Sequence, residues 1–251
     1  MKRLAIILVF IFCKNLYGQN LIVEYESIKK SAEQNYITYL IDGVDGIFNI
    51  NIFHKTYSDY GELLKDKDFL ESPIYVNSLK KDKENVYYGA IFFKKNKVFY
   101  KDVIKPIEWK LLNEFKTILG YKCRLAIGTF RGREYKAWYT DELPSSEGPW
   151  KLSGLPGLIL SAETGNSFSF EAVKVMINSN LSVPSKFKEI YSQKASAVDY
   201  KTFIKDENAY YTEIRDKQIA NLPKNIVLSN TPPIRSEFIE KSFEWDDTKT
   251  P

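Results

Sequence analysis

Histidine and cysteine are almost absent from this chain. It contains one histidine, His54, and two cysteines, Cys13 and Cys123. Any catalytic triad, histidine-based zinc site or histidine-centred general base would therefore have to use His54, which has no second ligand at a suitable spacing. The motifs of phosphate-binding loops, dinucleotide sites and metalloproteases are also missing. We therefore expect neither a metal nor a cofactor, although a site built from carboxylates alone stays open.

A long apolar run of membrane-spanning length is also lacking. The first eighteen residues have the layout of a secretory signal peptide: Lys2 and Arg3 precede the apolar run 4–12, and a short region ends at Gly18. That run is much shorter than the ~20 residues of a spanning helix. We therefore expect cleavage between Gly18 and Gln19, export to the periplasm or the outside, and no membrane span afterwards.

The excess of positive charge belongs largely to this leader. Residues 1–18 carry three basic residues and no acidic one, so their removal lowers the formal charge from +4 to +1. A nearly neutral mature chain has no broad electrostatic footprint for nucleic acid. We therefore expect no nucleic-acid partner.

Cys123 is the one cysteine of the expected mature chain, so an internal disulfide is excluded. We interpret it as a small buried side chain and expect the core to supply the stability. The length suits one β-rich domain, residues 19–228, because a chain of this size can bury a sizeable core. Residues 229–251 contain prolines and scattered charges, which predicts an extended wrap or a partly disordered tail.

Alternating apolar and polar residues indicate strands through much of the chain. The segments expected as strands or hairpins are 20–28, 35–43, 43–53, the hairpin around Lys94 to Asn96 within 85–104, the hairpin of 121–130 with 133–143, and two strands around the turn at Glu163 to Asn166. Between Ser58 and Glu84 charged and turn residues predict a long irregular excursion with one helical turn. An antiparallel meander is the expected arrangement.

The hairpin at Arg131 and Gly132 carries apolar side chains on both faces. Its first strand places Tyr121, Cys123, Leu125 and Ile127 on one face. Its second strand places Tyr135, Ala137 and Tyr139 on one face and Trp138 on the other. The pattern predicts a sheet that curves around something or is covered on both sides.

The stretch "GPWKLSGLPGLIL" places glycines and prolines directly before an apolar strand. In a type II turn, Pro156 would preset φ and Gly157 would take positive φ. We therefore expect a hard corner between two sheet segments. The residues of this structural motif are Gly154, Leu155, Pro156, Gly157, Leu158 and Ile159.

After Pro184 the period becomes helical. The residues Tyr200, Phe203, Ile204, Tyr211 and Ile214 fall on one stripe, and Ser196 with Asp199 resembles a capping box. We expect a helix over 197–220 whose stripe packs on the sheet. The fold class predicted is mainly β, a β-rich α+β fold: a strongly curved antiparallel sheet or half-barrel with one late helix packed on it.

Aromatic and guanidinium groups gather near the corner and could stack on a ligand. The candidate binding residues are Arg131, Arg133, Trp138, Tyr139 and Trp150. Core packing is the alternative for each aromatic side chain. Carboxylate-only glycan hydrolysis is a further alternative, because it needs neither histidine nor cysteine. Its candidate acids are Asp141, Glu142, Glu147 and Glu163.

Residues 118–160 resemble the signature of the GLPGLI family of exported proteins from Gram-negative bacteria. The segment contains "GYKC", "FRGR", "AWYT", "GPW" and "GLPGLI" in that order. The resemblance implies a strongly curved antiparallel scaffold, similar to the bowl-like amino-terminal domain of some bacterial peptide N-glycosidases. It implies no catalytic residues. We expect no appended glycosidase domain and therefore not the activity of those longer proteins.

Three functions are open at this stage. The favoured one is a non-enzymatic periplasmic or secreted binding or accessory protein that holds a hydrophobic, peptide or glycan ligand on a curved aromatic sheet. The second is the carboxylate-only glycan hydrolase. The third is a structural partner of an envelope protein complex that docks through the tail.

Overall fold

The computed structural model describes residues 21–30, 34–43, 46–53, 60–63, 65, 76–80, 85–177, 190–223 and 231–246. The expected signal peptide and His54 lie outside the described residues. Within the described part, no helix is both long and apolar enough to cross a membrane.

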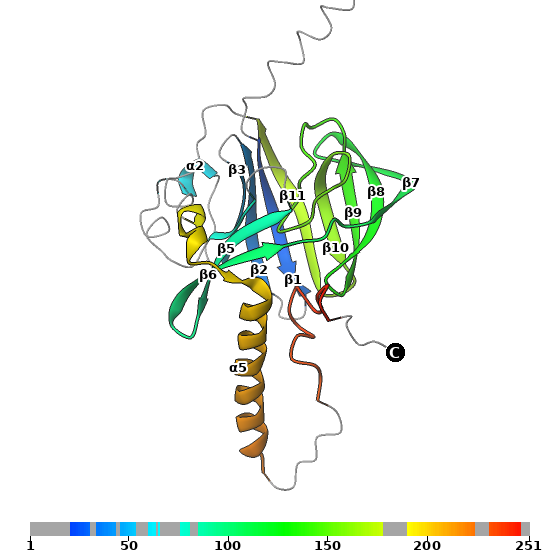
Figure 1. Cartoon of the computed structure of the whole chain (residues 1–251). Coiled ribbons are helices and arrows are strands. Elements are labelled where there is room, and N and C mark those ends of the chain that lie inside the picture. The colour runs from blue at the N-terminus through cyan, green and yellow to red at the C-terminus, as the bar shows by residue number, and fades with distance from the viewer. Residues whose placement is uncertain are drawn as a thin grey trace, which may run out of the picture.

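One large sheet dominates the fold (Figure 1). Its strands are β1 (Leu21–Lys29), β2 (Gln34–Gly43), β3 (Gly46–Phe53), β4 (Val76–Lys80), β5 (Val86–Phe93), β6 (Asn96–Val103), β7 (Trp109–Ile118), β8 (Tyr121–Phe130), β9 (Arg133–Thr140), β10 (Leu158–Thr164), β11 (Phe168–Ile177) and β12 (Val198–Asp199). The helical elements are α2 (Tyr60–Leu63), the short 3₁₀ helix η3 (Gln193–Ala195) and α5 (Tyr200–Ala220).

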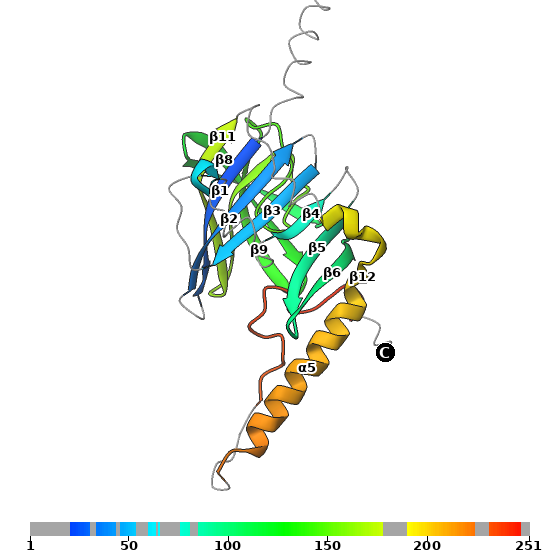
Figure 2. The ribbon, with the colours of Figure 1, turned by 90° about the vertical axis from the view of Figure 1, so that its left-hand side faces the viewer.

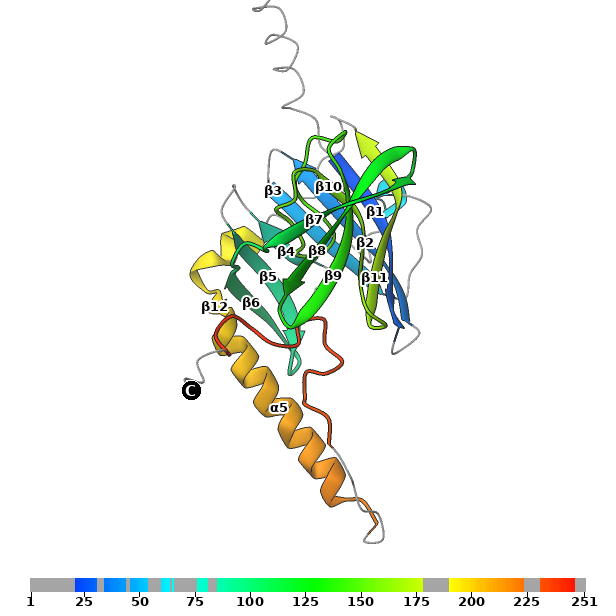
Figure 3. The same cartoon turned by 90° about the vertical axis from the view of Figure 1, so that its right-hand side faces the viewer.

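Two antiparallel meanders build this sheet. The strand order is β12-β6-β5-β4-β3-β2-β1-β11-β10-β9-β8-β7, so β1 to β6 form the first meander and β7 to β11 the second. The first and last strands of the two meanders, β1 and β11, pair from Leu21 with Ile177 to Lys29 with Phe168, with a bulge at Glu24 and Tyr25. The sheet curves without closing into a barrel (Figures 2 and 3). The predicted fold class is confirmed.

Three strands were not expected, and one of them, β12, lies at the start of the segment predicted to be helical. β4 lies inside the segment predicted to be irregular, and it pairs with β3 and, over two residues, with β5. β7 is an edge strand with mostly exposed side chains, so it lacks the buried alternation that marks a half-buried strand. The expected helical turn in the long excursion corresponds to α2.

The β8–β9 hairpin forms where it was predicted. Arg131 and Gly132 have φ of 45° and 76°, the left-handed conformations that a two-residue hairpin turn requires. Directly opposite residues share a face, and Leu125 pairs with Trp138 whereas Ala126 pairs with Ala137. Trp138 therefore lies on the face of Leu125, and the opposite face belongs to Ala137.

The prediction of a type II turn with positive φ at Gly157 is wrong. Positive φ occurs at Gly154, with 93°, and Gly157 is not among the glycines that adopt it. Gly157 is required for another reason: a Cβ there would lie 2.1 Å from the backbone oxygen of Thr140. The corner brings two backbone segments together more closely than any side chain permits.

The loop 141–157 links the two meanders. Lys151 forms an ion pair with Asp102 of β6 at 2.8 Å, and Glu147 forms one with Lys80 of β4 at 2.7 Å. All four side chains are almost completely buried. The apolar side chains of this loop are buried too: Leu143, Trp150, Leu152 and Leu155.

Helix α5 begins beside the sheet and then projects away from it (Figures 1 and 2). Asp199 caps it, because its carboxylate accepts hydrogen bonds from the backbone of Lys201 and Thr202. The predicted cap at Ser196 is therefore wrong, and the helix starts three residues later than expected. Within the predicted stripe, Tyr200, Phe203 and Ile204 are buried, whereas Tyr211 is 36% exposed and packs against Phe238 of the tail.

The tail segment 231–246 returns to the tip of the β8–β9 hairpin (Figure 3). Backbone nitrogens of Lys241 and Ser242 donate to the oxygen of Arg131. Glu240 and Phe243 are buried there. The described part of the tail is therefore an ordered wrap over the sheet and the start of α5.

Candidate functional site

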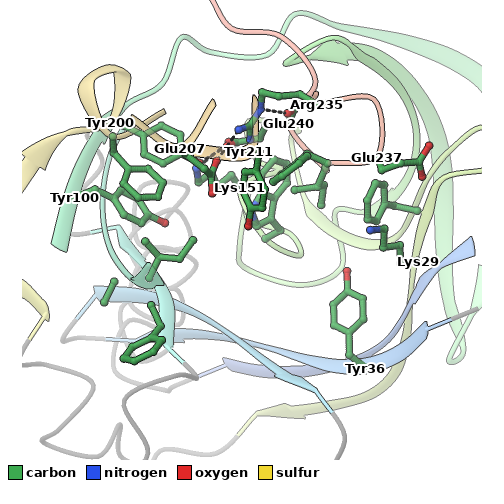
Figure 4. Close-up of a pocket in the computed structure, with 18 of the residues that line it drawn as sticks. Lys29, Tyr36, Tyr100, Lys151, Tyr200, Glu207, Tyr211, Arg235, Glu237 and Glu240 are labelled. Carbon is green, nitrogen blue, oxygen red and sulfur yellow. Dashed lines mark hydrogen bonds and ion pairs between the residues drawn. The ribbon is translucent and has the colours of Figure 1, made fainter. Parts of the chain in front are cut away.

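A cavity of about 520 Å³ lies between the sheet, α5 and the tail (Figure 4). That volume is in the range of small-molecule sites in proteins. The side chains around it come from β1, β2, β5, β6, β11, the loop 141–157, α5 and the tail. They are Lys29, Tyr36, Ala90, Ile91, Phe92, Tyr100, Trp150, Lys151, Phe168, Phe170, Tyr200, Phe203, Glu207, Tyr211, Arg235, Glu237, Phe238, Ile239 and Glu240.

The inner face of the sheet supplies an aromatic wall. Phe170 pairs with Ala162, which pairs with Ala137, so Phe170 lies on the face of Ala137 and away from Trp138. Phe168 follows two residues earlier and shares this face. Opposite Arg235 and Glu240, Tyr36 of β2 points its hydroxyl into the cavity (Figure 4). This wall is suited to contact an apolar ligand.

A buried network of charges holds the other wall together. The guanidinium of Arg131 donates to both carboxylate oxygens of Asp102, at 2.8 and 2.7 Å, and to Glu240 at 2.6 Å. Lys151 donates to the same two acids, at 2.8 and 2.9 Å. The hydroxyl of Tyr200 donates to the second oxygen of Glu240. Arg131 also donates to Glu244 at 3.2 Å. Two cations therefore face three anions, and all of these side chains except the partly exposed Glu244 are almost free of solvent contact.

These contacts fix the protonation states of the network. Burial alone would favour a neutral Glu240, but the charges and hydrogen bonds of Lys151, Arg131 and Tyr200 outweigh it and lower its pKa to about 2. Burial likewise opposes the charge of Lys151, and Asp102 and Glu240 reverse this and raise the pKa of its ammonium. Burial, followed by the charge of Glu240, raises the pKa of Tyr200. Glu240 therefore stays ionised, Lys151 stays protonated and Tyr200 stays neutral near neutral pH.

A second buried pair borders the cavity. Arg235 of the tail donates to Glu207 of α5 at 2.6 Å, and its Nε donates to the backbone oxygen of Glu240 at 2.9 Å. The side chains of Arg235 and Glu207 are 9% and 7% exposed. Burial raises the pKa of Glu207, and the bond to Arg235 acts against this. The pair ties the helix to the tail.

The predicted binding residues have separate places in the structure. Among them only Trp150 lines the cavity. Arg131 belongs to the buried network, and Arg133 holds the tail by donating to the backbone oxygens of Ser236, Phe238 and Ile239. Tyr139 is buried in the core. Trp138 lies on the opposite face, half-buried, with the Lys116 ammonium 4.9 Å from its ring centre.

The four candidate acids for hydrolysis do not line this cavity. Glu147 is paired with Lys80, and Glu142 accepts a hydrogen bond from the backbone of Lys122 at 2.8 Å. Glu163 lies 3.8 Å from Lys30 at the surface. Among the described residues, no cluster of three or more histidine, cysteine, aspartate or glutamate side chains could hold a metal ion.

Most cavity residues were missed in the sequence because they lie far apart along the chain. Glu240 is 109 residues from Arg131, and Arg235 is 28 residues from Glu207. One signal was present: Tyr200, Phe203 and Tyr211, all on the predicted helical stripe, line the cavity. The stripe serves both the core and the site.

The fold and its cavity define a β-rich domain with a curved sheet. The chain belongs to the family described as "N-glycanase peptide, N-terminal domain", whose model matches residues 62–206. Two solved structures of PNGF-II, in space groups C2 and P21, are similar in fold. They are 21% and 20% identical, with TM-scores of 0.50 and 0.51 over 72% and 74% of this chain. The chain spans 30% and 32% of their lengths. No curated protein matches.

Proposed function

We propose that this chain is an exported, non-enzymatic binding protein that holds a ligand with an apolar body in the cavity between the sheet and α5. The observation that carries the proposal is the cavity itself. It is about 520 Å³ in volume and is lined by aromatic and aliphatic side chains. Apolar enclosure with a few polar groups is the usual composition of a small-molecule site.

The charged groups of the cavity favour binding over catalysis. Lys151 and Glu240 neutralise each other, as do Arg235 and Glu207. A general acid or base must exchange a proton near the working pH. The lowered pKa of Glu240 and the raised pKa of Lys151 move both groups away from that range. These groups are suited to maintain the shape of the site.

The similarity to known proteins supports a non-enzymatic role. The matched family model describes the N-terminal domain of an N-glycanase, and the chain spans about a third of the PNGF-II structures. We therefore propose that the chain has the role of such an N-terminal domain and does not hydrolyse N-glycans. The ordered string from "GYKC" to "GLPGLI" further supports a place in the GLPGLI family and its exported members.

The leader supports the proposed location. To test it, the full chain is expressed in a Gram-negative host, the cell fractions are separated, and the intact protein is examined by native mass spectrometry. We expect a periplasmic or secreted protein that begins at Gln19 and carries a small-molecule adduct. A full-length protein that stays in the cytoplasm would refute export. If the protein is periplasmic but binds no apolar probe, the binding function is refuted and export still stands.

A further inference from the structure

The cavity contains a cation, Lys29, that has no anionic partner among the residues that the structure describes. The other two cations that line the cavity are occupied. Lys151 lies 2.9 Å from Glu240, and Arg235 lies 2.6 Å from Glu207. A negative group that enters the cavity can therefore meet a free ammonium only at Lys29, within the described part of the chain.

Lys29 lies at the end of the aromatic wall. It is the last residue of β1 and pairs with Phe168 of β11, so the two side chains share one face of the sheet. Phe170 continues the wall two residues further along β11. The side chain of Lys29 is half-buried, and its ammonium points into the cavity (Figure 4). A positive charge is thus placed directly beside an apolar surface.

Glu237 of the tail lines the cavity but does not compensate Lys29. No ion pair joins these two described residues. Glu237 is exposed, and its carboxylate points away from the cavity (Figure 4). Water and salt screen an exposed charge, whereas a half-buried charge beside apolar groups interacts more strongly. A negative group of a ligand would therefore gain an ion pair at Lys29 that Glu237 does not already supply.

We propose that the cavity takes an amphipathic anion, with an apolar chain or ring body against Phe168 and Phe170 and one carboxylate at the Lys29 ammonium. This inference rests on the proposed binding function and names the ligand class of the same site. The apolar body stabilises the complex in proportion to the area that it buries, and the charge sets the direction of the ligand. One ammonium compensates one negative charge, which suits a carboxylate better than a phosphate monoester, whose charge approaches −2.

Three probes with eight carbon atoms each test the selection. The purified chain is titrated by calorimetry at pH 7 with octanoate, 1-octanol and octylammonium. We expect octanoate to bind at least about tenfold more tightly than octylammonium, because both ions lose hydration and only the carboxylate meets an opposite charge. 1-Octanol should bind as well, because its chain buries a similar apolar area.

A substitution that removes the free cation should abolish the preference for the anion. Lys29→Met removes the charge and keeps a long apolar side chain. We expect this variant to bind octanoate at least about fivefold more weakly than the wild type does, and 1-octanol within about twofold of the wild type.

Lys30→Met is the matched control, because Lys30 is the next residue, is exposed and does not line the cavity. Its ammonium donates to the backbone oxygen of Gly165 at 3.3 Å. This variant should bind all three probes like the wild type. Circular dichroism establishes that both variants are folded, and the ranking of probes by the wild type is independent of either variant.

The outcomes separate the two proposals. If the wild-type chain binds octylammonium as tightly as octanoate or more tightly, the inference is overturned and the binding function still stands. The same follows if folded K29M keeps wild-type affinity for octanoate, if it loses 1-octanol to the same extent, or if K30M loses octanoate equally. If none of the probes binds, the proposed function fails and the inference fails with it.

Discussion

Arg131 and Asp102 form a bidentate ion pair in which neither side chain has any solvent exposure. Asp102 lies on β6 in the first meander, and Arg131 is in the β8–β9 turn of the second. The pair therefore connects the two halves of the sheet from the inside. Glu240 of the tail completes the contact at 2.6 Å.

Removing the cation from this network should destabilise the fold strongly. Arg131→Met leaves buried carboxylates without compensation, which costs about 3–5 kcal/mol in comparable cases. The control is Lys116→Met, which removes an exposed cation 4.0 Å from Glu171 and should cost less than about 1 kcal/mol. Urea denaturation measures both. Equal effects of the two substitutions would refute the structural role of the network.

Substitutions at Gly157 test whether this position needs glycine for lack of space or for a positive φ. Gly157→Ala should cost more than about 3 kcal/mol, because its Cβ would overlap the backbone of Thr140. Gly165→Ala should cost about 1–2 kcal/mol, because Gly165 has φ of 46° and open space around it. Asparagine tolerates positive φ, so it should be better than alanine at position 165 and no better at position 157. If the asparagine variant at position 157 were more stable than the alanine variant, the type II turn with positive φ at Gly157 would be supported.

The ionised carboxylate of Glu240 should make the stability of the fold depend on pH in the acidic range. Its pKa is lowered to about 2 in the folded chain, so its contribution is present above the ordinary glutamate pKa and is lost as the pH falls toward 2. Glu240→Gln should therefore be less stable than the wild type at pH 7, and the difference should shrink steadily below pH 4. Urea denaturation across this range measures it. A difference that stays constant with pH would show that Glu240 is not ionised in the fold.

Cys123 should be chemically silent in the native chain. Its side chain is buried, and burial raises the pKa of the thiol to about 11, so the reactive thiolate is scarce at neutral pH. A thiol reagent such as Ellman's reagent should label it slowly in buffer and stoichiometrically in urea. Fast labelling of the folded protein would contradict its burial.

The features that could be predicted from the sequence are those that depend on residues close together along the chain. The β8–β9 hairpin could be located because its alternation and its turn at Arg131 and Gly132 are local signals. The ion network could not, because Arg131 is 29 residues from Asp102 and 109 from Glu240. The tail has the composition of a flexible segment. Its order depends on Arg133 and on buried partners that no local pattern reveals.

The most direct test of the account is to fill the cavity and measure binding. Ala90 is 5% exposed and lines the cavity, whereas Ala209 is exposed on α5 outside it. The fluorescent uncharged probe Nile red is titrated against the wild type, Ala90→Trp and Ala209→Trp, with folding checked by circular dichroism. We predict that A209W binds like the wild type and that folded A90W binds at least about tenfold more weakly, because the indole occupies the apolar volume. Wild-type affinity in A90W would show that this cavity is not the binding site.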